Sequence, residues 1–538
     1  MKQINSTLLA TVLVGVTIIF SGLSIAKGGL FLGKHEVDVL HFMDILRRLQ
    51  LGYDIHIEFQ TPIGVMAFAP IIWFSNLGYD LGISFVLAQT LLAVLLLPVV
   101  WWVGVSRLGP IAAMFFGISI LAIVCAIVGG GSENSPSISM HYNRWSWAIS
   151  LSVLALGVIA PQEERRPRPN LEGLMIGVGM AVLALTKVTY FAGFAIPITV
   201  GLILNHNMRA LVMAVGAGLA VAALATAILG VEYWSAYLGD LLRVAGSDVR
   251  PYPGASMLDL LGAPAFIGIS FLAFMSCVVL RQSDQNKEAL LLLLCMPGFY
   301  FVTYQNFGND PVWLLFVIIV LMVYRPRNDI RNGLGWKMRS AASGVAIAAL
   351  AVMVPSYINL VTSPLRHAFV DASEYAPFLP DVSMDIHTAD IRGKKVTISS
   401  RVFSEELEEF VSPPEDEDIR EIAGMVLPDC TLEGGVAAMQ HAISAGVSKN
   451  VAAQGSSLFV ADVIMALWIE AGMLPAIGSA PWYYGGLTGY DNASYLLVPK
   501  CPLTAIQRII LDNIAEREGE TLSLIEDTEL YAFFRIDR

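Results

Sequence analysis

The acidic residues best placed for chemistry follow the first apolar segment of the chain. Glu36 and Asp38 stand at the N-terminal end of the stretch 37–49. The apolar residues of this stretch recur at helical spacing and indicate a helix lying flat on the bilayer. At the N-terminal end of such a helix the dipole favours an ionised carboxylate. A positioned carboxylate can take a proton from a hydroxyl group, so we predict that Glu36 or Asp38 is a general base. The alternative is that both acids only cap the helix.

Other polar and ionisable residues gather in the same stretch, in a second loop at 130–144, and at one break in an apolar run. These candidates for substrate binding are Asp44, His56, Glu58, Glu133, His141, Tyr142, Arg144 and Lys187. Arginine at a helix end suits a phosphate or diphosphate group, and we expect Arg144 and Lys187 to face one. Alternatively Lys187 only snorkels toward the membrane surface, and Tyr142 belongs to an interfacial aromatic belt.

Several common chemistries lack their motifs. The chain has no glycine loop followed by Lys-Ser or Lys-Thr, no Cys-x-x-Cys and no His-Glu-x-x-His, which disfavours ATP hydrolysis and zinc chemistry. No ligand spacing singles out a metal. A divalent cation therefore stays open as a cofactor, with its ligands unknown.

The composition requires these residues to be positioned by membrane helices. Of 538 residues, 55% are hydrophobic and only 14% are charged, with a mean hydropathy of +0.64. One water-soluble core could not bury so much apolar surface. Apolar runs of about 20 residues, the length that crosses a bilayer as a helix, recur as far as residue 361. The sequence predicts eleven spans, at 8–26, 81–104, 111–129, 145–160, 172–186, 188–204, 210–230, 257–280, 288–304, 312–324 and 341–361.

The basic loops set the predicted orientation. With the N-terminus in the cytosol, the loop at 163–168 and the basic segment 325–339 fall inside, as the positive-inside rule demands. This holds only if the short apolar stretch 62–74 dips into the outer leaflet without crossing. The C-terminal region then lies on the periplasmic side of a bacterial inner membrane.

The region 362–538 is predicted to be a separate α/β domain. It holds 12 Lys and Arg against 27 Asp and Glu, which gives it a charge of −15. The preceding part of the chain has a charge of +3, so the whole chain has a net charge of −12. Its runs at 395–399 and 495–499 read as strands, and 435–445 and 506–516 read as helices. So acidic a surface argues against nucleic acid as a partner. Cys430 and Cys501 could pair in an oxidising compartment, although spacing alone cannot decide this.

This order of elements resembles the GT-C superfamily of glycosyltransferases that use polyprenyl-phosphate sugars. The matching residues are Glu36-Val-Asp38, Asp44, Gly52-Tyr-Asp54 and Thr61-Pro-Ile-Gly64, and the likeness spans roughly residues 1–205. Members carry acidic residues early in a long first outer loop, then juxtamembrane helices, and a terminal soluble domain. At Pro62-Ile63 the chain departs from the two prolines that many members have.

The resemblance implies transfer of a sugar from a polyprenyl-phosphate carrier to a glycan, lipid or protein acceptor. In the arrangement of that superfamily Glu133, His141 and Arg144 would face the donor. A transporter or lipid flippase is the rival interpretation, but it calls for charges near the midplane of several spans, which are nearly free of them here. A polymerase or ligase of surface polysaccharide would use the same face and carrier with a different acceptor.

Overall fold

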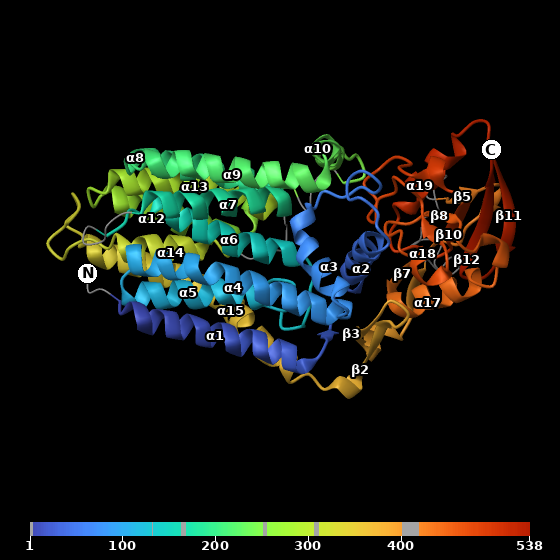
Figure 1. The fold of residues 1–538 in the computed structure, drawn as a ribbon, viewed down its shortest axis with the longest axis horizontal. Coiled ribbons are helices and arrows are strands. Elements are labelled where there is room, and N and C mark those ends of the chain that lie inside the picture. Colours follow the sequence, from blue (N-terminus) through green and yellow to red (C-terminus); the bar gives the residue numbers. More distant parts are fainter. Residues whose placement is uncertain (1–3, 132, 163–167, 251–255, 306–310, 401–418) are drawn as a thin grey trace, which may run out of the picture.

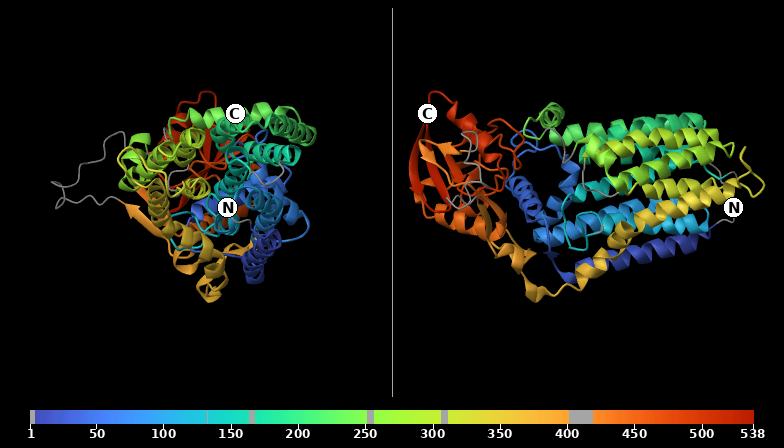
Figure 2. Two further views of the ribbon diagram at one scale, coloured as in Figure 1. Left: turned by 90° about the vertical axis from the view of Figure 1, so that its left-hand side faces the viewer. Right: turned by 180° about the vertical axis from the view of Figure 1, so that it is seen from behind.

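The chain forms a helix bundle followed by a region that contains sheets. The computed structural model describes residues 4–131, 133–162, 168–250, 256–305, 311–400 and 419–538. The N-terminus lies at the end of the bundle remote from the C-terminal region, and the C-terminus lies in that region (Figures 1 and 2). The loop 163–168, used above for orientation, falls almost wholly outside the described residues.

Every predicted span coincides with helix in the bundle. The bundle helices are α1 (Ser6–Lys27), α4 (Leu81–Arg107), α5 (Pro110–Cys125), α6 (His141–Val158), α7 (Pro169–Thr186), α8 (Val188–Leu204), α9 (Met208–Leu229), α11 (Met257–Gly262), α12 (Pro264–Arg281), α13 (Asn286–Gln305), α14 (Leu314–Val323) and α15 (Met338–Ala368). Within the described residues six of these, α1, α4, α7, α9, α13 and α15, are long and apolar enough to cross a membrane. The protein therefore has the character of a multi-pass helical membrane protein.

The bundle differs from the prediction in several places. The run 257–280 is divided at Ala263 into α11 and α12, and α15 continues to Ala368, beyond the expected boundary at 361. The stretch 62–74 gives a 3-10 turn, η1 (Val65–Ala67), and the eight-residue helix α3 (Ala69–Asn76), too short to span a bilayer. An additional helix, α10 (Glu232–Ala245), occupies a predicted outer loop.

The helix expected at the start of the first polar stretch is present as α2 (Glu36–Gln50). It was predicted to lie flat on the bilayer, but it lies between the bundle and the C-terminal region (Figure 1). Most of it is buried, including Val39, Phe42 and Ile45, because its apolar residues pack into the core cluster that also holds the C-terminal sheet. The apolar face of α2 is therefore covered by protein.

The C-terminal region is α/β, as its alternating patterns predict. Its strands are β2 (Tyr375–Leu379), β3 (Ser383–Ala389), β4 (Thr397–Ser400), β5 (Glu421–Ile422), β6 (Met425–Val426), β7 (Cys430–Gly434), β8 (Ser457–Val460), β9 (Leu474–Pro475), β10 (Tyr495–Pro499), β11 (Thr521–Asp527) and β12 (Tyr531–Asp537). Its helices are α16 (Asp390–Gly393), α17 (Val436–Val447), α18 (Trp468–Ala471) and α19 (Gln507–Ala515). The main sheet has the order β11-β12-β10-β8-β9. A disulfide joins Cys430 to Cys501 with their Cα atoms 4.9 Å apart, which confirms the pairing considered from sequence.

Backbone contacts attach this region to the bundle. Strand β1 (Leu30–Leu32), directly after α1, pairs in parallel with β3 and completes the sheet β1-β3-β2. The Asp385 carboxylate accepts hydrogen bonds from the backbone amides of Gly82 (2.8 Å) and Ile83 (2.6 Å) at the start of α4. A Cβ atom on Gly82 would lie 2.7 Å from the Asp385 carbonyl oxygen, so this approach requires glycine. Segments from both ends of the chain are therefore held together.

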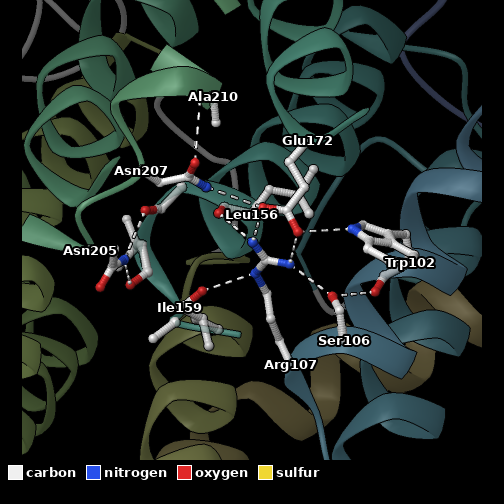
Figure 3. A network of polar contacts seen from close by, with 12 residues as sticks. Trp102, Ser106, Arg107, Leu156, Ile159, Glu172, Asn205, Asn207 and Ala210 are labelled. Atoms are coloured by element: carbon white, nitrogen blue, oxygen red, sulfur yellow. Dashed lines mark hydrogen bonds and ion pairs between the residues drawn. The ribbon is translucent and has the colours of Figure 1, made fainter. Parts of the chain in front are cut away.

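At the opposite end of the bundle a buried ion pair joins α4 to α7. The Arg107 guanidinium is fully buried and binds both carboxylate oxygens of Glu172, at 2.9 and 3.1 Å (Figure 3). The guanidinium also donates to the carbonyls of Leu156 and Ile159, and Trp102 donates to Glu172 (Figure 3). Arg107 thus fixes helix packing here, because its charge is matched locally.

Candidate functional site

Six polar side chains from five parts of the chain meet where the bundle joins the C-terminal region. We call them the crevice cluster: Asp38, His41, Tyr142, Lys187, Arg250 and Tyr484. The charge of Arg250 acts on His41, Tyr142, Lys187 and Tyr484, and the charge of Asp38 acts on both tyrosines. Figure 1 shows α2 between the two regions and α10 at the end of the bundle that is nearer the C-terminal region.

Helix α2 supplies Asp38 and His41. The two residues are three positions apart, so both side chains project from one face. With Tyr142 and neighbouring apolar residues they line a cavity of about 30 Å³, room for one water molecule. The hydroxyl of Ser139 donates to the Asp38 carboxylate. Asp38 is therefore oriented by one hydrogen bond and still borders open space.

His41 was part of the analysed stretch but was not predicted as a site residue. Its Nε2 atom is buried and has no hydrogen-bond partner among the described residues. The ring meets that of Trp482 edge to face, with centroids 5.5 Å apart. Burial, then the charges of Arg250 and Arg48, lower the pKa of His41 to about 4. The imidazole is consequently neutral at pH 7 and can exchange a hydrogen bond with a molecule in the cavity.

The basic side of the cluster is formed by Lys187 and Arg250. Lys187 lies between α7 and α8 rather than within either helix, and its ammonium sits 4.9 Å from the centre of the Tyr142 ring. Desolvation, and then the positive charge of Arg250, lower the pKa of Lys187 to about 7. A second positive charge near the Lys187 ammonium makes this side of the cluster favourable for an anion.

The two acids predicted as alternative bases have different surroundings. Glu36 is buried and forms a two-point ion pair with Arg392 of α16, with Arg392 Nη2 3.0 Å from Oε2. This pair fastens the first turn of α2 to the C-terminal region. Among the described residues the hydrogen-bond partner of the Asp38 carboxylate is the neutral hydroxyl of Ser139, and Asp38 lines the cavity. Of the two acids, Asp38 is the one that borders the cavity and has no ion pair in the described part of the chain.

Four other predicted residues are engaged away from the cavity. Asp44 is fully buried against Arg48, and Glu133 pairs with Lys34 at 2.7 Å. The Glu58 carboxylate accepts from the backbone amide of Asp54 at 2.7 Å. His56 Nδ1 lies 2.8 Å from the carboxylate of Asp240, and the His56 ring stacks on that of Tyr237. These contacts position loops around the crevice.

Two predicted residues of the second loop, Arg144 and His141, lie close to the cavity. The Arg144 guanidinium donates to the carbonyls of Val128 and Ser139, at 2.9 Å for Ser139, and so holds the residue that orients Asp38. The Nε2 atom of His141 lies 3.0 Å from the Ala67 carbonyl oxygen, and the side chain lines the cavity. The Nε and Nη2 atoms of Arg144 are buried and have no hydrogen-bond partner among the described residues, so the phosphate contact expected for Arg144 stays a prediction.

No protein-family model, curated protein or solved structure matches this chain. Any assignment of function therefore depends on the site itself.

A metal site would need several ligands that converge. Among the residues that the structure describes, no group of three or more His, Cys, Asp or Glu side chains is placed to hold a metal ion. The crevice cluster contributes one carboxylate and one imidazole. The cation considered from sequence has no ligand set in the described part of the chain.

The site residues that sequence reasoning missed come from distant segments. Arg250 follows α10, and Tyr484 lies in the aromatic and glycine-rich stretch 482–490. One signal could have revealed α10: its buried residues Tyr233, Tyr237 and Asp240 recur at the spacing of one helical face. For Arg250 and Tyr484 no local pattern shows that they approach α2, because this proximity arises only from the tertiary fold.

Proposed function

We propose that the protein is a membrane glycosyltransferase that moves a sugar from a polyprenyl-phosphate carrier to an acceptor at the periplasmic face. The observation that carries the proposal is an apolar groove in the bundle that ends beside the crevice cluster. A lipid-linked donor needs this combination, because its chain stays in the bilayer while its phosphate and sugar react at the surface.

The groove lies among α7, α8 and α9 and has a volume of about 390 Å³. Its walls include Met180, Leu185, Phe191, Ile198, Leu219 and Trp234. Leu219 is 65% exposed, so the groove is open on the side that faces lipid. Leu185 is two residues from Lys187, and α10 closes this end where the Tyr237 hydroxyl donates to the Ala184 carbonyl at 3.1 Å. An isoprenoid chain in this groove would place its phosphate near Lys187.

The charges of the crevice cluster suit the two halves of the reaction. Lys187 and Arg250 would bind the carrier phosphate and stabilise the negative charge that develops as it leaves. Asp38 would take the proton from the acceptor hydroxyl. The acceptor oxygen then forms a bond to the anomeric carbon, and the bond from that carbon to the phosphate oxygen breaks. The phosphate leaves with the electron pair, and attack from the opposite face inverts the anomeric centre.

The membrane arrangement belongs to the same proposal. Eleven crossings of a bacterial inner membrane, with the N-terminus in the cytosol, would place the C-terminal region and the crevice in the periplasm. Support comes from the opposite positions of the N-terminus and the C-terminal region along the bundle (Figure 1). A nucleotide sugar is not available at that face, whereas a lipid-linked sugar is. Membership of the GT-C superfamily is likewise a proposal, supported by Glu36-Val-Asp38 and by the terminal soluble region.

The composition of the groove argues against the alternative function, that of a flippase. Movement of a glycan through the bundle would need a polar path, but the groove walls are apolar apart from Thr199 and the indole of Trp234. The walls suit a hydrocarbon chain that stays in place.

Carrier binding and turnover provide two tests. In a deletion strain, mass spectrometry of the lipid extract should show a lipid-linked sugar that accumulates. The purified protein in nanodiscs should bind undecaprenyl phosphate in preference to undecaprenol, and Lys187→Met should weaken binding of the phosphate by about tenfold without changing undecaprenol binding. Lys34→Met is the matched control, because Lys34 pairs with Glu133 outside the crevice cluster. Equal binding of the two lipids by the wild type would refute the proposal.

A further inference from the structure

The C-terminal region contributes one wall of the site through its segment 478–486. Hydrogen bonds dock this segment on the first polar stretch: the amide of Gly478 donates to the Glu58 carbonyl at 2.6 Å, and the amide of Gln60 donates to the Ser479 carbonyl at 3.3 Å. The Arg48 guanidinium adds a bond to the Ser479 hydroxyl at 3.0 Å. The wall is thus fixed against α2 and the loop that follows it.

The other end of the segment is fixed to its own sheet region and to the loop after α10. The amide of Tyr483 donates to the Val463 carbonyl at 2.8 Å. Gly485 adopts a φ of +113°, and a Cβ atom there would lie 3.3 Å from Val249, next to Arg250. A residue with a side chain is strained at this φ, so glycine lets the segment approach the basic side of the site.

Trp482 and Tyr484 lie in this docked segment, close to α2. Trp482 covers His41, as described above, and Tyr484 is only 8% exposed. Burial raises the pKa of Tyr484 to about 12; the charge of Arg250 opposes this rise, and the charges of Asp240 and Asp38 add to it. The hydroxyl is therefore protonated at neutral pH and can donate a hydrogen bond.

We propose that Tyr484 binds the acceptor, and that the acceptor is a carbohydrate. This inference rests on the proposed function. The donor chain enters from the lipid side, at Lys187, so the acceptor must reach Asp38 from the aqueous side, where the C-terminal region forms the wall. Aromatic rings that alternate with hydroxyl and imidazole groups suit a sugar, which presents apolar ring faces and many hydroxyls. Tyr484 would hold the hydroxyl next to the one that Asp38 deprotonates.

The test separates donor binding from turnover with full-length protein. Tyr484→Phe removes only the hydroxyl, and Tyr483→Phe is the control, because Tyr483 is the adjacent tyrosine and packs in the core cluster. In nanodiscs, Tyr484→Phe should bind undecaprenyl phosphate with an affinity within about twofold of wild type. When it replaces the wild type in the deletion strain, the lipid-linked sugar should accumulate about tenfold above the complemented level. Tyr483→Phe should match wild type in both measurements, and Tyr484→His, which keeps a ring and a donor, should clear part of the accumulated lipid.

Two results would overturn the inference while leaving the proposed function in place. In the first, Tyr484→Phe clears the lipid-linked sugar as fast as wild type, so the hydroxyl has no part in turnover. In the second, it loses affinity for undecaprenyl phosphate as Lys187→Met does, which would assign Tyr484 to the donor. If the wild type neither prefers undecaprenyl phosphate nor clears a lipid-linked sugar, both proposals fall together.

Discussion

The different surroundings of Glu36 and Asp38 lead to opposite expectations for two conservative substitutions. Asp38→Asn removes the charge that would accept the proton and keeps an oxygen that can still accept from Ser139. We expect the transfer rate to fall by roughly 10² to 10⁴, the usual contribution of a general base. Stability should change by less than about 1 kcal/mol, because the single hydrogen bond is retained.

Glu36→Gln perturbs a different function. The Glu36 side chain is 7% exposed and that of Arg392 is 42% exposed, so the freed guanidinium can turn to water. The loss should fall between that of a surface pair and that of a buried pair, about 1 to 2 kcal/mol. A lower melting temperature with a largely retained rate is the expected result.

The assay for both variants combines thermal melting in nanodiscs with transfer from the lipid-linked sugar that accumulates in the deletion strain. Asp54→Asn serves as the control, since Asp54 is an exposed acid of the same polar stretch. A wild-type rate for Asp38→Asn would exclude Asp38 as the base. A rate loss for Glu36→Gln of 10² or more, with unchanged melting, would return that role to Glu36.

Three further predictions concern stability. Arg107→Met leaves Glu172 charged and buried and should cost about 3 to 5 kcal/mol, measured by denaturant unfolding in detergent; an unchanged midpoint would contradict the pairing. Reduction of the Cys430–Cys501 bond, which closes a separation of 71 residues, should cost about 4 kcal/mol and lower the melting temperature, whereas unchanged melting would contradict this estimate. Burial raises the pKa of Asp462 from 3.8 to about 7, so between these pH values the folded state holds a proton that the unfolded state has released. The free energy of unfolding should therefore fall as the pH rises from about 4 to 7. Asp462→Asn should remove that part of the pH profile; a profile unchanged by the substitution would contradict the assignment.

The helices were predictable because their signal is local. A run of apolar residues long enough to span a bilayer has few alternatives to a helix, and each predicted run is largely helical, although 257–280 is divided between two helices. Helix α10 was missed because its sequence is amphipathic and lies in a loop that length and hydropathy marked as polar. The break at Ala263 was missed because Pro264 can begin a helix as readily as interrupt one.

The site was predictable only in part, since a pattern in the sequence shows chemistry but not proximity. Asp38 could be named as a candidate because it lies at the start of a helix directly after the first span, and its role as a base stays a prediction. Asp44 and Glu133 carry the same carboxylate in the same loops, yet each is paired with a nearby cation. The partners Arg48 and Lys34 were visible in the sequence, and the i,i+4 spacing of Asp44 and Arg48 is a helix pairing that could have been anticipated. Arg392, the partner of Glu36, is separated from it by hundreds of residues and could not be anticipated.

The ion pair and hydrogen bonds of these polar segments hold the two parts of the structure together, which fits the proposed chemistry. A site assembled from a membrane bundle and a water-soluble region loses its geometry if the two parts shift against each other, and displacements of about 1 Å at a reacting group can cost 10²-fold in rate. Glu36 with Arg392, Arg48 with Ser479, and Asp385 with the amide of Gly82 each fasten the two parts together around the crevice. The acids that surround Asp38 thereby hold α2 in place, so that one carboxylate with a neutral partner can remain directed at the cavity.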